Sequence, residues 1–207
     1  MLSQFQYDLE NLLSNPAGLR PFVCEGSPLE CRIFIVGFNP ATELSRSFWE
    51  FWQPDYGFRK SDWFEIYKQK RREKPLSPGK TRRREISNTR RVIEWIVDAA
   101  RPVKCLETNI YSRPSEDAVS LRERDRVTKP FDFLLNRIQP KAILVHGNDA
   151  TAYMEALMKT SLPLWDLQSV VATWGSVHIL AVPHLSRGWS EAKAREVGTE
   201  LRHVCTK

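Results

Sequence analysis

The sequence predicts an α/β protein, organised as a three-layer α/β/α sandwich around a short, mainly parallel central sheet. Short continuous apolar runs, typical of buried strands, alternate along the chain with segments of helical periodicity. Strands that alternate with helices favour parallel pairing, with helices on both faces of the sheet. The 207 residues, of which 42% are hydrophobic, suit a single domain over residues 1–207 with a sizeable core.

The first part of the chain contains a helix, a strand and an aromatic-rich segment. Residues 4–13 carry apolar side chains on one face, which predicts an amphipathic helix. After a loop at 21–28, the continuous apolar run 33–36 predicts a buried strand. We expect a further helix, capped by Thr42 or Ser45. Its aromatic side chains are Phe48, Trp49, Phe51 and Trp52.

The middle of the chain contains two helices, a loop and a strand. Residues 61–72 predict a helix with Trp63, Ile66 and Tyr67 facing inward. Residues 74–84 are polar and contain Pro and Gly, which predicts a loop. Ser87 or Asn88 caps the next helix, and the second strand follows at 103–108.

The last part of the chain completes the sheet. Residues 115–128 are charged and predict a surface excursion. The last two strands should form a hairpin that turns at Gly175. The elements expected here are helices at 131–138, 150–158 and 190–202, and strands at 142–145, 170–174 and 177–182.

Basic residues concentrate in one stretch of the chain. The net charge is +6, and residues 68–91 contain eleven Lys or Arg but only two Glu. We interpret residues at about 68–84 as a basic loop insertion that suits phosphate contacts; the alternative is a solvated surface loop. The candidate phosphate-binding residues are Lys80, Arg82, Arg83 and Arg84.

Absent motifs argue against several classes of protein. No apolar run approaches ~18 residues and the N-terminus lacks a signal pattern, so we expect a cytoplasmic protein with no membrane partner. The four cysteines form no CxxC pair, and the sequence has no P-loop, GxGxxG or HExxH motif. We therefore expect buried free thiols, a monomer, and neither a metal nor another cofactor.

Polar side chains follow three of the predicted strands. Asn39 lies in the turn 37–41 after the first strand, Asn109 follows the second, and His184 follows the last. Because ligands bind at the carboxyl ends of strands in open α/β sheets, these residues are candidates for a site. Two amides and an imidazole can orient water, contact a planar heterocycle and stabilise an anion. Each also suits a structural role in a turn, which is how we interpret His146 after the third strand.

Several segments resemble known motifs. The turn 37–41, Gly-Phe-Asn-Pro-Ala, is similar to the first motif, Gly-Ile-Asn-Pro-Gly, of the mismatch-specific thymine/uracil glycosylases. Residues 182–186, Val-Pro-His-Leu-Ser, resemble the second motif, His-Pro-Ser. Three more segments resemble stretches of the iron–sulfur type: 24–37, 108–114 and 133–150. In order and spacing, residues 23–186 resemble the uracil-DNA glycosylase superfamily.

The resemblance implies a uracil-DNA glycosylase-like fold and a monofunctional DNA glycosylase acting on a flipped-out, non-standard pyrimidine. In such an enzyme Asn39 would position the water that attacks C1′, Asn109 would bind the base edge, and His184 would stabilise the departing base. No Lys occupies a motif position, so we expect hydrolysis without a lyase step. The loop after His184 would contact DNA through Ser186, Arg187 and Trp189.

The resemblance also implies an aromatic side chain stacked on the base. The candidates for stacking are Phe48, Trp49, Trp52 and Tyr56. The base pocket would be completed by Phe38, Ala41 and Thr42.

Departures from the family bear on cofactor and substrate. Ser112 and Pro130 stand where the iron–sulfur type has cysteines, so we expect no cluster. Ala41 and Thr42 replace the aromatic guard of the most efficient uracil enzymes, so the pocket can admit a 5-substituent. The substrate is then uracil, as in DNA repair, or a 5-modified cytosine such as glucosylated hydroxymethylcytosine of phage DNA, as in anti-phage defence. The alternative is a catalytically inactive DNA-binding module that recognises modified bases.

Overall fold

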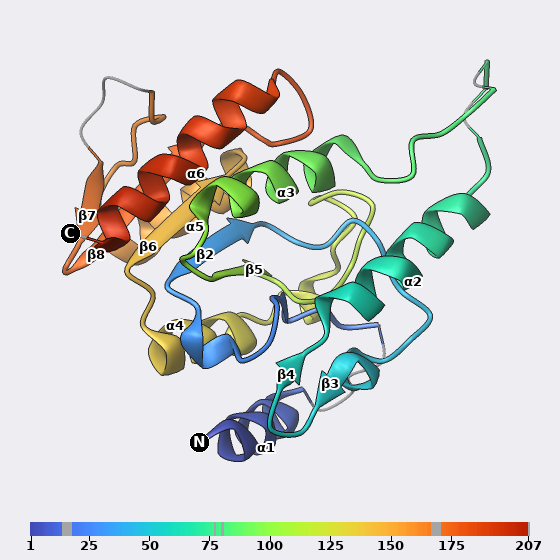
Figure 1. The fold of residues 1–207 in the computed structure, drawn as a ribbon, viewed down its shortest axis with the longest axis horizontal. Helices are drawn as coiled ribbons and strands as arrows, with labels where there is room; N and C mark the ends of the chain where they lie inside the picture. Colours follow the sequence, from blue (N-terminus) through green and yellow to red (C-terminus); the bar gives the residue numbers. More distant parts are fainter. Residues whose placement is uncertain (14–17, 77, 80, 167–170, 207) are drawn as a thin grey trace.

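The computed structural model shows an α/β fold (Figure 1). It describes residues 1–13, 18–76, 78–79, 81–166 and 171–206. The α-helices in this part of the chain are α1 (Leu2–Leu12), α2 (Lys60–Glu73), α3 (Asn88–Ala100), α4 (Lys129–Ile138), α5 (Asn148–Met158) and α6 (Glu191–Thr206). The strands are β1 (Phe22–Val23), β2 (Ile33–Gly37), β3 (Trp52–Gln53), β4 (Gly57–Phe58), β5 (Cys105–Asn109), β6 (Ala142–His146), β7 (Ala172–Trp174) and β8 (Val177–Val182). Short 3-10 helices are η1 (Pro28–Glu30), η2 (Phe48–Phe51) and η3 (Glu123–Asp125).

Six strands form one mixed sheet in the order β1-β5-β2-β6-β8-β7. The central strands β5, β2, β6 and β8 are parallel to one another, whereas β1 and β7 each pair antiparallel with their neighbour. The prediction of a mainly parallel sheet is therefore corrected to a mixed one. β7 has to be antiparallel because Trp174 pairs with Val177 across a two-residue turn. β1 lies within residues 21–28, which we expected to be a loop.

Helices cover both faces of the sheet. Along β2, Ile33 and Ile35 belong to a core cluster with α3 and α6, whereas Phe34 and Val36 belong to a second cluster with α1, α4 and α5. This alternation follows from the two-residue period of a strand. α3 and α6 lie side by side (Figure 1). They approach closely at Gly198, where a Cβ would lie 2.3 Å from a backbone carbonyl oxygen of α3. The arrangement is compatible with three layers.

The aromatic-rich segment is not the α-helix that we predicted. It forms the single 3-10 turn η2, followed by the β3–β4 hairpin. The capping box between Ser47 and Glu50 stabilises only this one turn, and Asp55, with a φ of 64°, then reverses the chain. Phe48 and Trp52 pack against aromatic side chains of β1 and α1. The segment therefore belongs to the core.

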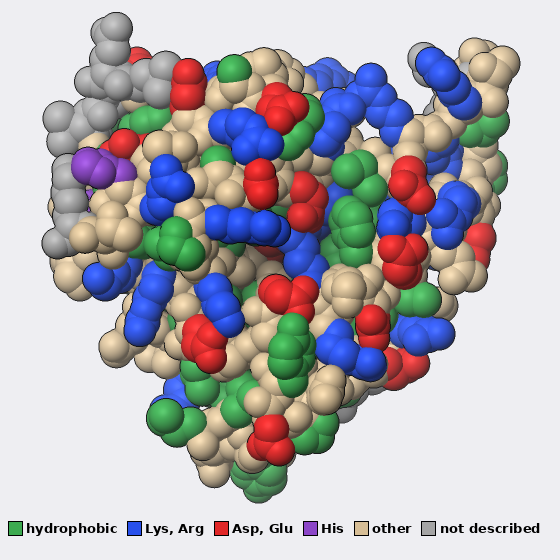
Figure 2. Space-filling model, viewed as in Figure 1, with side chains coloured by type: hydrophobic (Ala, Val, Ile, Leu, Met, Phe, Trp, Pro, Cys, Tyr) green, Lys and Arg blue, Asp and Glu red, His purple; other side chains and the backbone are tan. Residues whose placement is uncertain are grey.

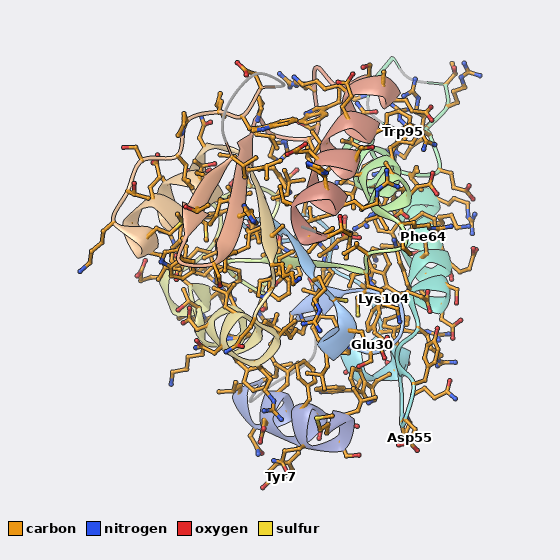
Figure 3. The ribbon with its side chains drawn as sticks, turned by 60° about the vertical axis from the view of Figure 1, so that its left-hand side comes forward. Tyr7, Glu30, Asp55, Phe64, Trp95 and Lys104 are labelled. Carbon is orange, nitrogen blue, oxygen red and sulfur yellow. The ribbon has the colours of Figure 1, made fainter. Side chains whose placement is uncertain are left out.

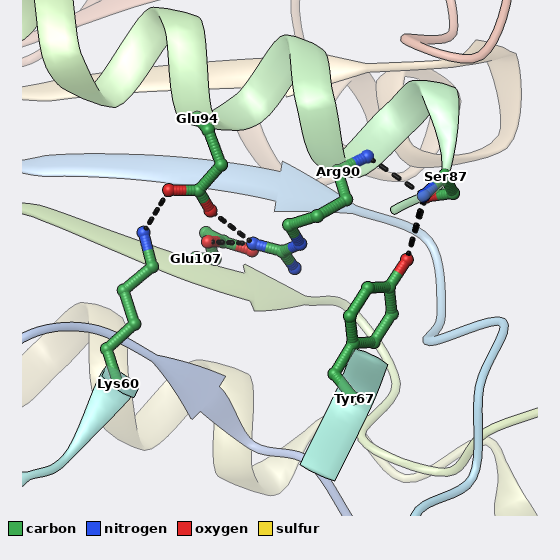
Figure 4. Close-up of polar contacts among 6 residues, drawn as sticks. All are labelled: Lys60, Tyr67, Ser87, Arg90, Glu94 and Glu107. Atoms are coloured by element: carbon green, nitrogen blue, oxygen red, sulfur yellow. Dashed lines mark hydrogen bonds and ion pairs between the residues drawn. The ribbon is translucent and has the colours of Figure 1, made fainter. Parts of the chain in front are cut away.

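A buried charge network holds α2 and α3 against the sheet (Figure 4). Arg90 of α3 donates to Glu107 of β5 and lies 3.3 Å from Glu94, which accepts from Lys60 of α2 at 2.8 Å. The guanidinium of Arg90 also lies 4.8 Å from the centroid of the Trp63 ring. Burial alone would raise the pKa of Glu107, but the positive charges of Arg90 and Lys60 outweigh burial and lower that pKa. The network thus fixes both helices that flank the basic segment.

Two expectations from composition can be compared with the structure. All four cysteines are buried and free, as predicted. Burial raises the pKa of the Cys24 and Cys105 thiols, which makes them poor nucleophiles. Among the described residues, no helix is long and apolar enough to cross a membrane.

Candidate functional site

The carboxyl ends of the central strands bring three polar side chains together. Gly37 pairs with Asn109 across β2 and β5. A Cβ added to Gly37 would lie 2.8 Å from Asn109 Oδ1 and 3.1 Å from His146 Nε2. A Cβ added to Gly147 would lie 3.1 Å from His184 Cδ2. The sequence predicts that Asn39, Asn109 and His184 converge. The structure places Asn109 and His184 at the same sheet edge, and His146 lies close to both Gly37 and His184.

The ring of His184 has a defined tautomer. Its Nδ1 accepts a hydrogen bond from the backbone N–H of Ser186 at 3.3 Å and lies 2.8 Å from the Oγ of the same residue. A backbone N–H can only donate, so Nδ1 carries no proton and the neutral ring carries its proton on Nε2. Although the residue is exposed, partial desolvation of the ring lowers the pKa of His184. His184 is thus a neutral donor through Nε2, oriented by Ser186.

His146 is the site residue that we had interpreted as structural. Only 8% of it is exposed, and its ring lies 5.4 Å from that of His184 in an edge-to-face arrangement. Burial, and then the proximity of His184, lower the pKa of His146 to about 3. Its Nδ1 is buried with no hydrogen-bond partner among the described residues. A neutral imidazole therefore lies against both Gly37 and His184.

Asn39 lies in the turn after β2 and is half-buried. Its Nδ2 donates to Ser115 Oγ at 2.8 Å and to the carbonyl oxygen of Pro40 at 3.2 Å. These bonds hold the side chain in a single orientation. The amide oxygen Oδ1 is then the polar atom that remains to bind water.

The structure corrects the predicted aromatic partners of a base. Phe48 and Trp52 are 3% and 7% exposed and lie in the core, so neither can stack on a ligand. Trp49 packs edge-to-face on both, and the hydroxyl of Tyr56 donates to Glu25. The family resemblance implied a stacking aromatic in this segment. Phe48, Trp49 and Trp52 instead pack on one another, whereas Tyr56 is 43% exposed.

Phe38 is the predicted aromatic candidate that lies next to Asn39 in the chain. It directly precedes Asn39, is half-buried, and lies 5.0 Å from the ring of Tyr111 in an edge-to-face arrangement. Tyr111 in turn lies 6.5 Å from the ring of Tyr153. The sequence analysis missed both tyrosines, although Tyr111 follows Asn109 by two residues.

Ala41 and Thr42 line a cavity of about 410 Å³ between the turn after β2 and the end of α2. Ala41 is exposed and Thr42 half-buried. The other lining residues are Glu43, Lys70, Arg71, Glu73, Lys74 and Pro75. The cavity is therefore rich in charged side chains, with cations in excess.

The basic segment between α2 and α3 contains both anchored and exposed arginines. Arg83 donates to the backbone carbonyl oxygens at the end of α2, including that of Arg71 at 3.0 Å, so its predicted role in phosphate binding is corrected to a structural one. Arg82 and Arg84 are exposed. Lys80 lies outside the described residues. Lys and Arg side chains lie on this projecting segment and along its base (Figure 2).

The loop after His184 connects the site to α3 and α6. The backbone carbonyl oxygen of Ser186 accepts from Asn88 Nδ2 at 3.3 Å, which places the start of α3 beside the loop. Arg187 is exposed, and Trp189 is half-buried with Lys193 Nζ 5.0 Å from its ring centroid. The exposed Arg187 remains available to a phosphate, while Trp189 packs against the protein.

A larger cavity lies away from this sheet edge. It has a volume of about 710 Å³ and lies between α2 and α3 near the start of β5, with Phe64 and Trp95 on its walls (Figure 3). It contains none of the predicted site residues. Several of its charged groups have ion-pair partners: Lys60 pairs with Glu94 within the lining, and Lys104 pairs with Glu30 outside it.

Comparisons with known proteins add no family to this description. No protein-family model and no curated protein matches the chain. Among the described residues, no group of three or more His, Cys, Asp or Glu side chains is arranged to hold a metal ion. The function has to be argued from the site itself.

Proposed function

We propose that the protein is a monofunctional DNA glycosylase with a uracil-DNA glycosylase-like fold. It would hydrolyse the N-glycosidic bond of a flipped-out, non-standard pyrimidine and leave an abasic site. The observation that carries this proposal is the meeting of Asn109, His146 and His184 at one sheet edge, with Asn39 held in the adjoining turn. The proposal includes a cytoplasmic monomer that binds DNA.

In the proposed reaction, two side chains act on opposite ends of the breaking bond. Asn39 Oδ1 accepts a hydrogen bond from a water molecule and places its oxygen toward C1′. The water oxygen forms a bond to C1′ as the bond from C1′ to the base breaks. The electron pair of the broken bond passes into the pyrimidine, and the water proton ends on the departed base. His184 Nε2–H donates to the base oxygen where negative charge develops. Because His184 is neutral, it acts as a hydrogen-bond donor and keeps its proton.

Base recognition is assigned to the floor and wall of the pocket. Extruding a base from the duplex costs a few kcal/mol, and stacking on an aromatic ring offsets about 1–3 kcal/mol. Phe38, which precedes Asn39 and packs edge-to-face on Tyr111, is assigned as the aromatic wall. Asn109 lies at the floor, and its amide can match either uracil or cytosine, depending on which way it is turned.

The basic segment supports DNA as the partner. The segment starts beside Ala41 and Thr42, which share a cavity with the end of α2, and it ends beside Ser186, which accepts from Asn88. Both ends therefore lie near the proposed base pocket. Exposed cations in this position would contact phosphates that flank the flipped nucleotide.

The 410 Å³ cavity favours a substituted base within this proposal. It lies next to the small residues Ala41 and Thr42, and its volume is within the range of ordinary ligand pockets. A 5-modified cytosine such as glucosylated hydroxymethylcytosine of phage DNA, in a role in anti-phage defence, is therefore proposed beside uracil and DNA repair.

Base release is the direct test. Oligonucleotides that contain uracil, hydroxymethylcytosine or its glucosylated form are incubated with the protein, and abasic sites are then cleaved with alkali. Strand breaks on at least one of them are expected. Asn39→Ala should abolish base release without weakening DNA binding. The control is Asn136→Ala, the same change on the exposed side of α4, and it should leave both base release and DNA binding unchanged. Binding without strand breaks on any oligonucleotide would favour the second candidate, an inactive module that recognises modified bases.

A further inference from the structure

The segment that follows β5 reaches the turn that follows β2. The backbone N–H groups of Ile110 and Tyr111 donate to the carbonyl oxygens of residues 37–38, each at 3.0 Å. The backbone N–H of Ser115 donates to the carbonyl oxygen of Pro40, also at 3.0 Å. Ser115 is thereby fixed beside the amide of the candidate catalytic residue.

The contacts around the Asn39 amide allow only one orientation. Its Nδ2 lies 2.8 Å from Ser115 Oγ, 3.2 Å from Pro40 O and 3.3 Å from Ser115 O. Carbonyl oxygens only accept, so the group that faces them must be the NH₂. The hydroxyl proton of Ser115 is donated to the carbonyl oxygen of Asp117, so Oγ is also an acceptor toward Asn39. Because the amide is planar, Oδ1 points away from these three acceptors.

A short turn holds the acceptor of the Ser115 proton in place. Asp117 Oδ1 accepts from the backbone N–H of Ser120 at 2.7 Å and from its hydroxyl at 2.6 Å. These two hydrogen bonds lower the pKa of Asp117, so the carboxylate stays ionised at neutral pH. The start of the excursion at 115–128 is therefore an ordered support for the amide.

We propose that Ser115 is a positioning residue for base release, acting through the amide of Asn39. The inference rests on the glycosylase function proposed above. With Oδ1 toward the pocket, the amide accepts a hydrogen bond from water and leaves a lone pair of the water directed at C1′. With the amide turned over, the NH₂ group would engage that lone pair and the water could not attack. Ser115 itself touches neither base nor sugar in this assignment.

Two substitutions separate positioning from packing. Ser115→Ala removes the closest acceptor and leaves two weaker carbonyl contacts, so the single-turnover rate of base release should fall about tenfold. Affinity for the DNA should stay within about twofold, because only the water is misplaced. Ser115→Thr keeps the hydroxyl and should recover the rate to within about threefold. Ser176→Ala, at the exposed turn between β7 and β8, is the matched control and should behave like the wild type.

The outcomes are distinct. A wild-type rate in Ser115→Ala overturns the inference. So does a slow Ser115→Ala enzyme that Ser115→Thr fails to rescue, or one whose DNA affinity falls together with its rate, because both results indicate lost packing. A wild-type protein that releases no base from any oligonucleotide refutes the proposed function itself, and that result is visible before any variant is made.

Discussion

The substitution Gly37→Ala adds one methyl group next to Asn109 and His146, and it therefore tests the geometry of this sheet edge. An alanine Cβ there would lie 2.8 Å from Asn109 Oδ1 and 3.1 Å from His146 Nε2. Ordinary contacts begin at 3.4 Å, so the amide would have to retreat by about 0.6 Å. Both neighbours are largely enclosed by protein, because Asn109 is 9% and His146 8% exposed. Gly37 does not have a positive φ, so the methyl contact, rather than backbone strain, is what Gly37→Ala introduces.

The expected effects of Gly37→Ala differ in size for stability and for activity. Overpacking a buried site costs about 1–3 kcal/mol of unfolding free energy, which leaves a domain of this size folded. A misplacement of ~1 Å in an active site costs about 100-fold in rate, so a shift of about half that should lower base release roughly 10- to 100-fold. The loss should appear on every base that the wild type releases, because the proposed reaction assigns Asn109 to the edge of each of them.

The assay combines thermal unfolding with single-turnover base release. Ile96→Val is the control: Ile96 is a fully buried residue of α3 in the core cluster shared with α6, and the change costs about 0.5–1.5 kcal/mol. It should lower the melting temperature of the protein but leave the release rate unchanged. If folded Gly37→Ala releases the base at the wild-type rate, Asn109 is not the base-binding residue and the assignment of this edge fails.

Three further predictions concern charge. Burial lowers the pKa of His146 to about 3, so as the pH falls below about 6.5 the unfolded chain binds a proton on this residue before the folded protein does. The free energy of unfolding, measured with urea, should therefore fall by about 1.4 kcal/mol per pH unit relative to His146→Phe. Arg90→Met leaves Glu107 buried without its partner and should lower the free energy of unfolding by about 3–5 kcal/mol in the same assay. Arg82→Ala should reduce the salt slope of DNA binding by about 0.9, whereas Arg83→Ala should lower the melting temperature and leave the slope unchanged.

The central strands could be predicted because a strand that is buried on both faces needs consecutive apolar side chains, which form a continuous apolar run in the sequence. Residues 33–36 and 142–145 are examples, and both lie inside observed strands. The edge strand β1 has only two residues and no such signal, so its antiparallel pairing could not be foreseen. The segment with the 3-10 turn at Phe48–Phe51 was predicted to be a helix capped by Thr42 or Ser45, but the turn begins after Ser47 and ends at Phe51. Ser and Thr can cap one turn as well as three, so the cap residues did not show where the turn ends.

The site was predictable where a polar residue lies at, or within two residues of, the end of a strand. Asn109 and His184 were found in this way, because the carboxyl ends of parallel strands meet at one edge. His146 ends its own strand, but its meeting with His184 depends on the register of β6 with β8, which the sequence does not show. The contact between Ser115 and Asn39 joins residues 76 positions apart through a loop, and no local pattern encodes such a contact.

The buried ion pair between Arg90 and Glu107 helps to position the basic segment, because it fixes the packing of α2 and α3, the helices that flank this segment. A buried pair such as Arg90 with Glu107 contributes little net stability, because desolvating the two charges opposes their attraction. Its effect here is geometric, since it fixes α3 to β5 and, through Lys60, also fixes α2. The end of α2 lines the cavity beside Thr42, and the start of α3 contacts the loop after His184. The ends of the basic segment are therefore held in place relative to the strand ends. Phosphate contacts from this segment would need such a fixed position to place one nucleotide over the proposed pocket.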